Sequence, residues 1–349
     1  MRFRRLLLMV FVICLTAGVW ACGSGDDDGG ETNAPTGTES AAPGAAYILY
    51  RDASGNIIAS NLATAETFRQ PVDFESEVVI SAMCSPDSKR VALLKQRFTV
   101  TNRELVILGE DAPDEEIPLS AAVQGMDWSP DGTHLVYTEY DGFENIHKVG
   151  ILDIAAGEAT ELGAADNLAG SPSWSPDGST IAYNVQDAIG NFSDVLLLDA
   201  SGGEPQKLQI GSGGLWYDPE WTPDGESLLV SGISEGESQL YLVSADGGEP
   251  AAITNSDIFK RSPEYSPDGA QIAYTGSIVI QTVSLNALHS FGIFLMNSDG
   301  SDERALTADP RLNPGAAVDP YLDAFLLGWC LPGPWLDDSW EPVAALPTP

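Results

Sequence analysis

The sequence predicts an all-β fold, a six-bladed β-propeller with four-stranded blades. A bulky residue followed by Ser or Thr, Pro and Asp recurs five times, at an almost constant interval of about 45 residues. Between the copies, short apolar runs alternate with Gly- and Asp-containing turns, which is typical of short strands. Segments with helical periodicity are scarce. Self-similarity at this period indicates an array of one repeated supersecondary unit.

One complete unit begins at Trp174. The next four residues, Ser175–Gly178, form a tight turn, because Pro presets φ, Asp bonds the backbone two residues on and Gly takes a positive φ. Residues 180–183 and 194–199 are the next two strands, and a second turn at 200–203 precedes a short fourth strand near 206–208. Four short strands in about 45 residues are the pattern of one propeller blade.

Two chemical groups recur in the copies of the motif, a large side chain, usually an aromatic ring, and a carboxylate. We expect the rings to be buried between blades, which stabilises the fold by roughly 2–3 kcal/mol for each ring. The carboxylates could be taken for a row of catalytic or metal-binding groups, but the turn explains them fully. The rings are Trp128, Trp174, Trp221 and Tyr265, with Cys84 in the first copy and Trp329 in a looser last copy; the carboxylates are Asp87, Asp131, Asp177, Asp224 and Asp268.

These repeats resemble the WD40-like repeats of the TolB propeller family, which are also found in the propellers of tricorn and prolyl oligopeptidase-type proteases. The resemblance covers roughly residues 46–335. It implies protein–protein contact, but it does not imply an activity, because propellers host many functions.

The two ends of the repeat region supply the sixth blade. Residues 46–50, 56–62 and 68–72 resemble the second, third and fourth strands of a unit, and the segment carrying Trp329 supplies the first. One C-terminal strand and three N-terminal strands therefore close the ring, which leaves no free edge between blades.

The N-terminus resembles a bacterial lipoprotein signal. Three arginines precede an apolar run that is short for a membrane span, and Cys22 follows it as the expected lipid acceptor. The alternative is a plain cleaved signal with an incidental cysteine. We divide the chain into a signal peptide (1–21), a disordered acidic and Gly-rich tether (22–45), the propeller (46–340) and a C-terminal tail (341–349).

The composition is strongly acidic, with 51 Asp and Glu against 16 Lys and Arg and a formal net charge of −35. Such a field repels nucleic acid and anionic membrane surfaces. It favours solubility over a dedicated cation-binding role, and no calcium loop of the EF-hand type is present.

The strand order predicts two different faces. The motif turns and the Asp-Gly-Gly turns share one face, and the longer connections, where function is expected, lie on the other. On this long-loop face we predict Trp216, Tyr217 and Asp218 as ligand contacts on an inter-blade loop, although packing between blades is equally compatible with Trp216. Residues 277–290 are an insertion that predicts an extra hairpin or flap.

Catalytic signatures are scarce. There is no Gly-x-Ser-x-Gly elbow, and His134, His147 and His289 are not at metal-ligand spacing, so no catalytic residue, metal or cofactor is predicted. Cys84 and Cys330 face each other across the ring closure if the motif ring points to the preceding blade, and diverge if it points the other way. A closing disulfide and two buried thiols both remain open.

Together these features predict a non-enzymatic, exported binding or scaffolding propeller that is lipid-anchored at the cell envelope. Its partner is an envelope protein or a small ligand such as a saccharide. Two alternatives remain: a carbohydrate-active lyase or hydrolase that uses loop carboxylates, and the propeller subunit of an envelope protease or transport complex. A carboxylate cluster with a His or Arg in a pocket on the long-loop face would favour the enzyme, and aromatic and small residues would favour binding.

Overall fold

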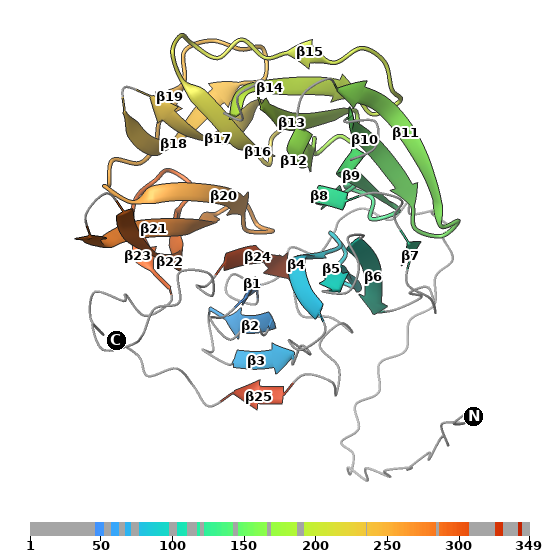
Figure 1. Cartoon of the computed structure of the whole chain (residues 1–349), viewed down its shortest axis with the longest axis horizontal. Helices are drawn as coiled ribbons and strands as arrows, with labels where there is room; N and C mark the ends of the chain where they lie inside the picture. The colour runs from blue at the N-terminus through green and yellow to red at the C-terminus, as the bar shows by residue number, and fades with distance from the viewer. Residues whose placement is uncertain are drawn as a thin grey trace, which may run out of the picture. The chain divides into compact units, whose positions relative to one another are not determined.

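A computed structural model confirms the propeller. It describes residues 46–51, 57–62, 67–70, 77–97, 103–109, 117–118, 122–141, 146–165, 169–186, 192–234, 236–283, 286–306, 325–330 and 341–343. The signal, the tether and Cys22 lie outside these residues. Within them all regular structure is β, in six antiparallel sheets that form a ring (Figure 1). The described part contains no helix that could cross a membrane.

Five blades are formed by consecutive strands, each blade with its first strand innermost. Blade 1 contains β4 (Glu77–Cys84), β5 (Arg90–Arg97), β6 (Arg103–Gly109) and β7 (Ile117–Pro118). Blade 2 contains β8 (Ala122–Trp128), β9 (His134–Asp141), β10 (Ile146–Asp153) and β11 (Glu158–Ala165). Blade 3 contains β12 (Ala169–Trp174), β13 (Thr180–Gln186), β14 (Phe192–Asp199) and β15 (Gln206–Lys207).

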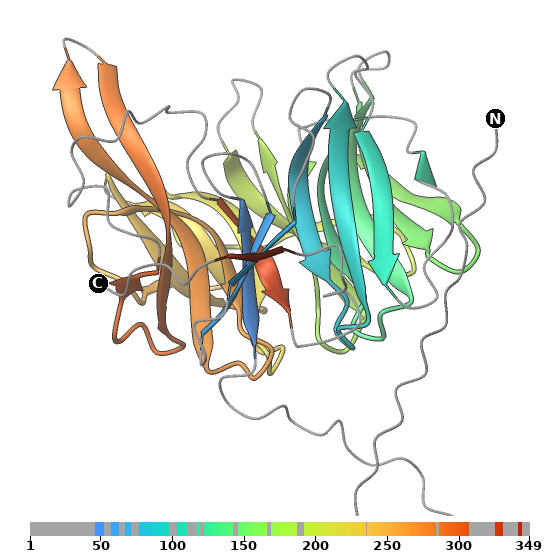
Figure 2. The same ribbon diagram turned by 90° about the horizontal axis from the view of Figure 1, so that it is seen from below.

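The next two blades repeat this order. Blade 4 contains β16 (Leu215–Trp221), β17 (Ser227–Ser234), β18 (Glu237–Ser244) and β19 (Ala251–Ala252). Blade 5 contains β20 (Phe259–Tyr265), β21 (Gln271–Val283), β22 (Asn286–Asn297) and β23 (Arg304–Ala305). The pairing of β21 with β22 continues to Val283 opposite Asn286, so the predicted insertion lengthens this hairpin and does not add a separate one; its two strands project beyond the other blades on one face (Figure 2).

Blade 6 closes the ring. The C-terminal strand β24 (Phe325–Cys330) pairs with β1 (Tyr47–Arg51), which is followed by β2 (Ile57–Asn61) and β3 (Thr67–Gln70), as predicted. A fifth strand, β25 (Glu341–Val343), pairs with the outer edge of β3. These three residues were expected to belong to a C-terminal tail. They extend the sheet instead, because β3 offers an unpaired outer edge.

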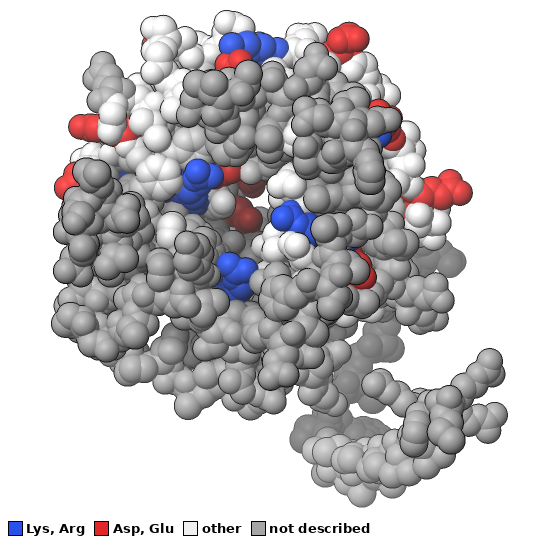
Figure 3. Space-filling view, viewed as in Figure 1, with Lys and Arg blue, Asp and Glu red and all other residues white. Residues whose placement is uncertain are grey.

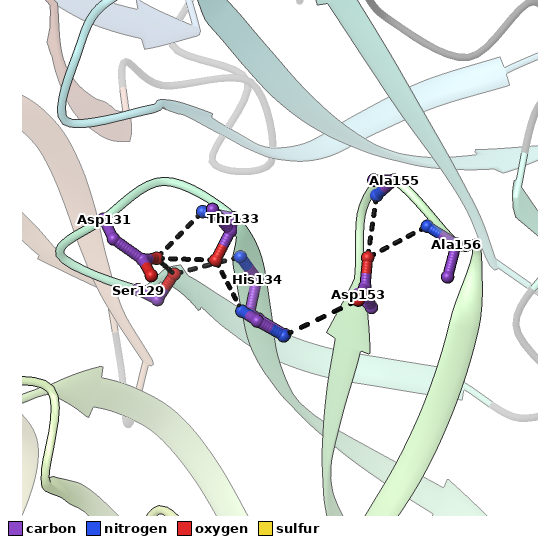
Figure 4. Close-up of polar contacts among 7 residues, drawn as sticks. All are labelled: Ser129, Asp131, Thr133, His134, Asp153, Ala155 and Ala156. Atoms are coloured by element: carbon purple, nitrogen blue, oxygen red, sulfur yellow. Dashed lines mark hydrogen bonds and ion pairs between the residues drawn. The ribbon is translucent and has the colours of Figure 1, made fainter.

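The motif carboxylates form turns. In blade 2, Oδ1 of Asp131 accepts hydrogen bonds from the Ser129 hydroxyl at 2.6 Å and from the Thr133 backbone N–H at 3.0 Å (Figure 4). Gly132, between them, has a φ of 68°. These bonds, the Ser129 hydroxyl first, lower the pKa of Asp131 to about 2. The same bonds recur at Asp177, Asp224 and Asp268.

The aromatic rings of the motif pack against the preceding blade. The indole N–H of Trp128 donates to the carbonyl of Met83 at 3.1 Å, and that of Trp329 donates to the carbonyl of Glu264 at 3.2 Å. Cys84 occupies the ring position of the first blade, so its side chain points to blade 6. There it is joined to Cys330 by a disulfide, with 5.4 Å between the two Cα atoms. The covalent bond therefore crosses the seam where the ring closes.

Candidate binding site in the central channel

The first strands of all six blades line a cavity of about 450 Å³ at the centre of the ring. In three blades an acidic residue that directly precedes the motif ring lines this cavity. Because side chains alternate along a strand, and the ring points to the preceding blade, this residue points toward the following blade at the inner edge. It is Asp127 in blade 2, Glu220 in blade 4 and Glu264 in blade 5. Figure 3 shows acidic atoms deep inside the central hollow.

Asp127 joins two blades. Its Oδ1 accepts the backbone N–H of Trp128 at 2.8 Å, and its Oδ2 accepts the backbone N–H of Trp174, in the next blade, at 2.6 Å. An innermost strand has one edge without a neighbouring strand, so its N–H groups need such partners. Burial raises the pKa of Asp127 to about 7, although the two N–H groups act in the opposite direction.

Ser173 repeats this arrangement one blade further on. Its hydroxyl accepts the backbone N–H of Trp221 at 3.3 Å and donates to Oε2 of Glu220 at 3.0 Å. Burial raises the pKa of Glu220 well above its usual range, and the neighbouring charges of Asp127 and Glu264 add to this effect.

Glu264 completes the group of channel carboxylates, by which we mean Asp127, Glu220 and Glu264. Burial raises its pKa to about 8, and the charge of Asp127 contributes in the same direction. A raised pKa means that the protonated form is favoured near neutral pH. The cavity wall can thus donate hydrogen bonds, and an entering cation can replace the protons.

A fourth carboxylate lies nearer the long-loop face. Asp218 accepts the hydroxyl of Ser171 at 2.7 Å and the backbone N–H of Ser262 at 3.0 Å, so it connects blades 3, 4 and 5. All three residues occupy the same position of their strands, where the pairing with the second strand is interrupted by a bulge. Their φ angles are 40°, 49° and 47°. Such bulges bend a strand and redirect its side chains, here toward the channel.

The structure corrects the location of the predicted contact residues. Trp216 and Tyr217 lie in strand β16 and not on a loop, and they are only 4% and 3% exposed. Trp216 packs edge-on against Tyr241, and Tyr217 stacks on Phe259. The glycines before them suggested a flexible loop, but burial of two large rings favoured a strand over an exposed loop. Of the three predicted residues, only Asp218 lines the cavity.

The channel carboxylates were not predicted from the sequence, because the Asp after each motif Pro is the more regularly repeated acidic position. A signal was present, because the residue before the motif ring is acidic in three of the six copies. Of the histidines, His147 is buried and the imidazole of His134 lies 3.8 Å from Asp153 (Figure 4). The side chain of His289 lies outside the described part. No described group of three or more His, Cys, Asp or Glu side chains is arranged to hold a metal ion.

Comparison with known proteins agrees with this architecture. The family described as TolB beta propeller domain (PD40) matches residues 117–320, more than half of the chain. The chain belongs to this family. Among curated relatives of this TolB-type propeller, TolB of the Tol-Pal system from Anaeromyxobacter dehalogenans is 30% identical over 110 residues, which are 31% of this chain and 23% of that protein. An uncharacterized peptidase, YuxL, from Bacillus subtilis is 40% identical over 62 residues, 18% of this chain and 9% of that protein.

Solved structures share the fold of this TolB-type propeller. A putative TolB from Agrobacterium tumefaciens has a TM-score of 0.57 at 20% identity, over 75% of this chain and 88% of that one. An oligogalacturonate lyase in complex with manganese has a TM-score of 0.50 at 17% identity, over 74% and 77% of the two chains. At these identities the likeness concerns the fold alone. The matched segments of the curated relatives are a minor part of their length.

Proposed function

We propose that this protein is a non-enzymatic binding propeller whose central channel takes a positively charged group of a partner or ligand. One observation carries the proposal. Of the described residues that line the cavity, four are acidic (Asp127, Asp218, Glu220 and Glu264) and none is Lys, Arg or His. A concave site with a few convergent polar groups is the usual form of a ligand site. A cation neutralises the negative charge of buried carboxylates that lie close together.

Binding of a simple cation tests the proposal. We expect octylammonium, measured by isothermal titration calorimetry, to bind the wild-type protein and to bind the Glu220→Gln, Glu264→Gln double variant at least about tenfold more weakly, the equivalent of about 1.4 kcal/mol. Asp131→Asn and Asp177→Asn, which change two carboxylates of the motif turns, are the matched control. Equal affinity for all three proteins would contradict the proposal.

The natural partner is then sought with the same variants. We propose that the protein is exported and anchored through Cys22, and that its partner is an envelope protein or a small ligand; the kinship with the Tol-Pal system protein TolB supports the envelope setting. In affinity capture from envelope extracts, a specific partner should be retained by the wild type and lost by the double variant. Mass spectrometry of the mature N-terminus should find an acylated Cys22, and Cys22→Ser should release the protein into the soluble fraction.

Export also agrees with the Cys84–Cys330 disulfide, because such bonds persist in oxidising compartments. After cleavage of the signal and acylation of Cys22, no cysteine should remain reactive. Thiol titration of the denatured, non-reduced protein should therefore find no free thiol, and two free thiols would contradict the bond.

The competing hypothesis is an enzyme that uses the channel carboxylates. The raised pKa of Glu264, about 8, is the feature that favours it, because a protonated carboxyl near neutral pH can act as a general acid. However, no His or Arg lines the cavity beside the acids in the described part. Turnover of an oligosaccharide by the wild type and its loss in Glu264→Gln would replace the binding proposal by this one.

A further inference from the structure

Three arginines from different blades reach the long-loop end of the channel. In blade 6, Nη1 of Arg51 donates to the carbonyl of Val79 at 3.1 Å, and in blade 1, Nη1 of Arg103 donates to the carbonyl of Val123. Val79 and Val123 lie near the beginnings of β4 and β8, the innermost strands of the blades that follow. Both guanidinium groups therefore cross a blade boundary to reach the channel wall.

The third arginine belongs to blade 5. The guanidinium of Arg261 lies 4.7 Å from the ring centroid of Tyr217 and 5.6 Å from that of Phe259. Arg261 is in the innermost strand β20, immediately before Ser262, which lines the cavity. We call Arg51, Arg103 and Arg261 the arginine collar.

Two members of the collar reach the wall of the cavity. Val79 and Val123, which hold two of its members, are each followed by a residue that lines the cavity, Ile80 and Gln124. Figure 3 shows basic atoms around the central hollow and acidic atoms within it. In a chain with 16 basic and 51 acidic residues, three arginines around one opening are a marked local reversal of charge.

The charge of Arg103 is not compensated by an ion pair within the described residues. Burial alone lowers the pKa of this guanidinium group. A half-buried guanidinium held by a carbonyl keeps further N–H donors for a planar anion such as a carboxylate. Since the chain as a whole repels anions, a singly charged carboxylate fits the collar better than a doubly charged phosphate.

The collar and the channel carboxylates lie at different depths. Along the innermost strands, Val123 precedes Asp127 by four residues and Arg261 precedes Glu264 by three. A straight strand rises about 3.3 Å per residue, and bulges interrupt both segments, so the two levels are separated by at most roughly 10–13 Å along the channel. The channel thus presents three arginines at its mouth, with Asp218 near the same level, and the channel carboxylates deeper inside.

We propose that the arginine collar is an anion subsite, which binds the carboxylate of a zwitterionic ligand while the ligand's ammonium group lies among the channel carboxylates. This rests on the proposed function of the channel and extends it, because it requires both charges on one ligand at a defined separation. The collar would select for ligands that carry the carboxylate and would orient them with the ammonium group inward.

Three probes of one chain length separate the two subsites. These are octylammonium, which has only the cation, octanoate, which has only the anion, and ω-aminooctanoate, which carries both and is comparable in extended length to the separation of the two levels. By calorimetry, we expect ω-aminooctanoate to bind at least about tenfold more tightly than octylammonium, and octanoate to bind most weakly. The shorter ω-aminobutanoate should lose this gain, because it cannot reach both levels.

Arg103→Gln should reduce the affinity for ω-aminooctanoate to that for octylammonium and should not weaken the binding of octylammonium, which has no carboxylate for the collar to bind. Arg261→Gln provides a second variant if Arg103→Gln does not fold, which unfolding curves will show. Arg90→Gln is the matched control, because Arg90 also donates to a backbone carbonyl, that of Gly132, and lies 5.3 Å from the ring of Trp128, but at the motif-turn end.

The results distinguish the two proposals. If octylammonium and ω-aminooctanoate bind equally well and Arg103→Gln and Arg261→Gln change neither affinity, the anion subsite is refuted while the cation-binding channel stands. If neither ammonium compound binds, the proposed function fails, and the zwitterionic site fails with it.

Discussion

Two sets of carboxylates lie only a few residues apart in this chain and have opposite properties. Asp131 sits in an exposed turn, where hydroxyl and N–H groups lower its pKa to about 2. Asp127, four residues earlier, faces the channel, where burial raises its pKa to about 7. Both accept backbone hydrogen bonds, so the bonds alone do not explain the difference. Solvent access does: water and local donors stabilise the turn carboxylates, and the channel removes water from the others.

The comparison teaches that a repeated carboxylate need not be the functional one. The motif Asp residues are repeated because each blade needs the same turn. The channel carboxylates occur in three blades out of six, in a place where their charge costs stability. Asp127 also has a structural role, because it accepts two strand N–H groups, but a residue such as Glu264, whose burial disfavours its charge, is a candidate for function.

Among the substitutions considered, Asp127→Ala should lower the stability of the protein the most. It removes the acceptor of the Trp128 and Trp174 backbone N–H groups, and two buried unpaired donors cost about 2–4 kcal/mol in the free energy of unfolding. Urea denaturation followed by tryptophan fluorescence measures the loss. Asp127→Asn, which retains an acceptor, should lose less, and an equal loss in both variants would show that the carboxylate, and not the acceptor, matters.

Glu264→Gln, in contrast, should increase the free energy of unfolding. Because its folded-state pKa of about 8 exceeds the unfolded value of about 4.3, the native state binds more protons between these values, and this contribution to stability falls as the pH rises. The amide should therefore stabilise the protein by about 1–3 kcal/mol at pH about 8.5 and make little difference near pH about 4. Unfolding curves across this range give the result; a gain independent of pH would contradict it.

Asp131→Ala should destabilise the protein by only about 1 kcal/mol, because it removes hydrogen bonds that water partly replaces. The loss should be constant from about pH 5 to about pH 9, since the lowered pKa keeps Asp131 charged throughout. Asp177→Ala, at the equivalent turn, serves as the internal replicate in the same denaturation assay. Unequal losses would show that the turns are not interchangeable.

His134→Gln should have the smallest effect. The imidazole and the Asp153 carboxylate are 39% and 43% exposed and 3.8 Å apart, and exposed pairs of this kind contribute less than about 0.5 kcal/mol. The midpoint of urea denaturation should shift within experimental error. A larger shift would mean that the exposed rim of the blade carries more stability than the comparison assigns to it.

The sequence by itself determined the blade count, the closing strands and the role of the motif. These follow from local rules, because a Ser-Pro-Asp-Gly turn and a strand that presents a large ring specify the same blade each time they occur. It also identified the insertion in blade 5, which lengthens an existing hairpin, and the ends that form blade 6. Strand β25 could not be predicted from the sequence, because a strand of three residues forms only where an unpaired sheet edge is already in place.

Only the tertiary structure decided where the candidate site lies. Asp127, Glu220 and Glu264 are about 45 residues apart along the chain or more, and nothing local shows that ring closure places them around one cavity. The same closure buried Trp216 and Tyr217 and brought Arg51, Arg103 and Arg261 to one opening. Burial and charge proximity are properties of the assembled ring, which the pattern of a single blade does not contain.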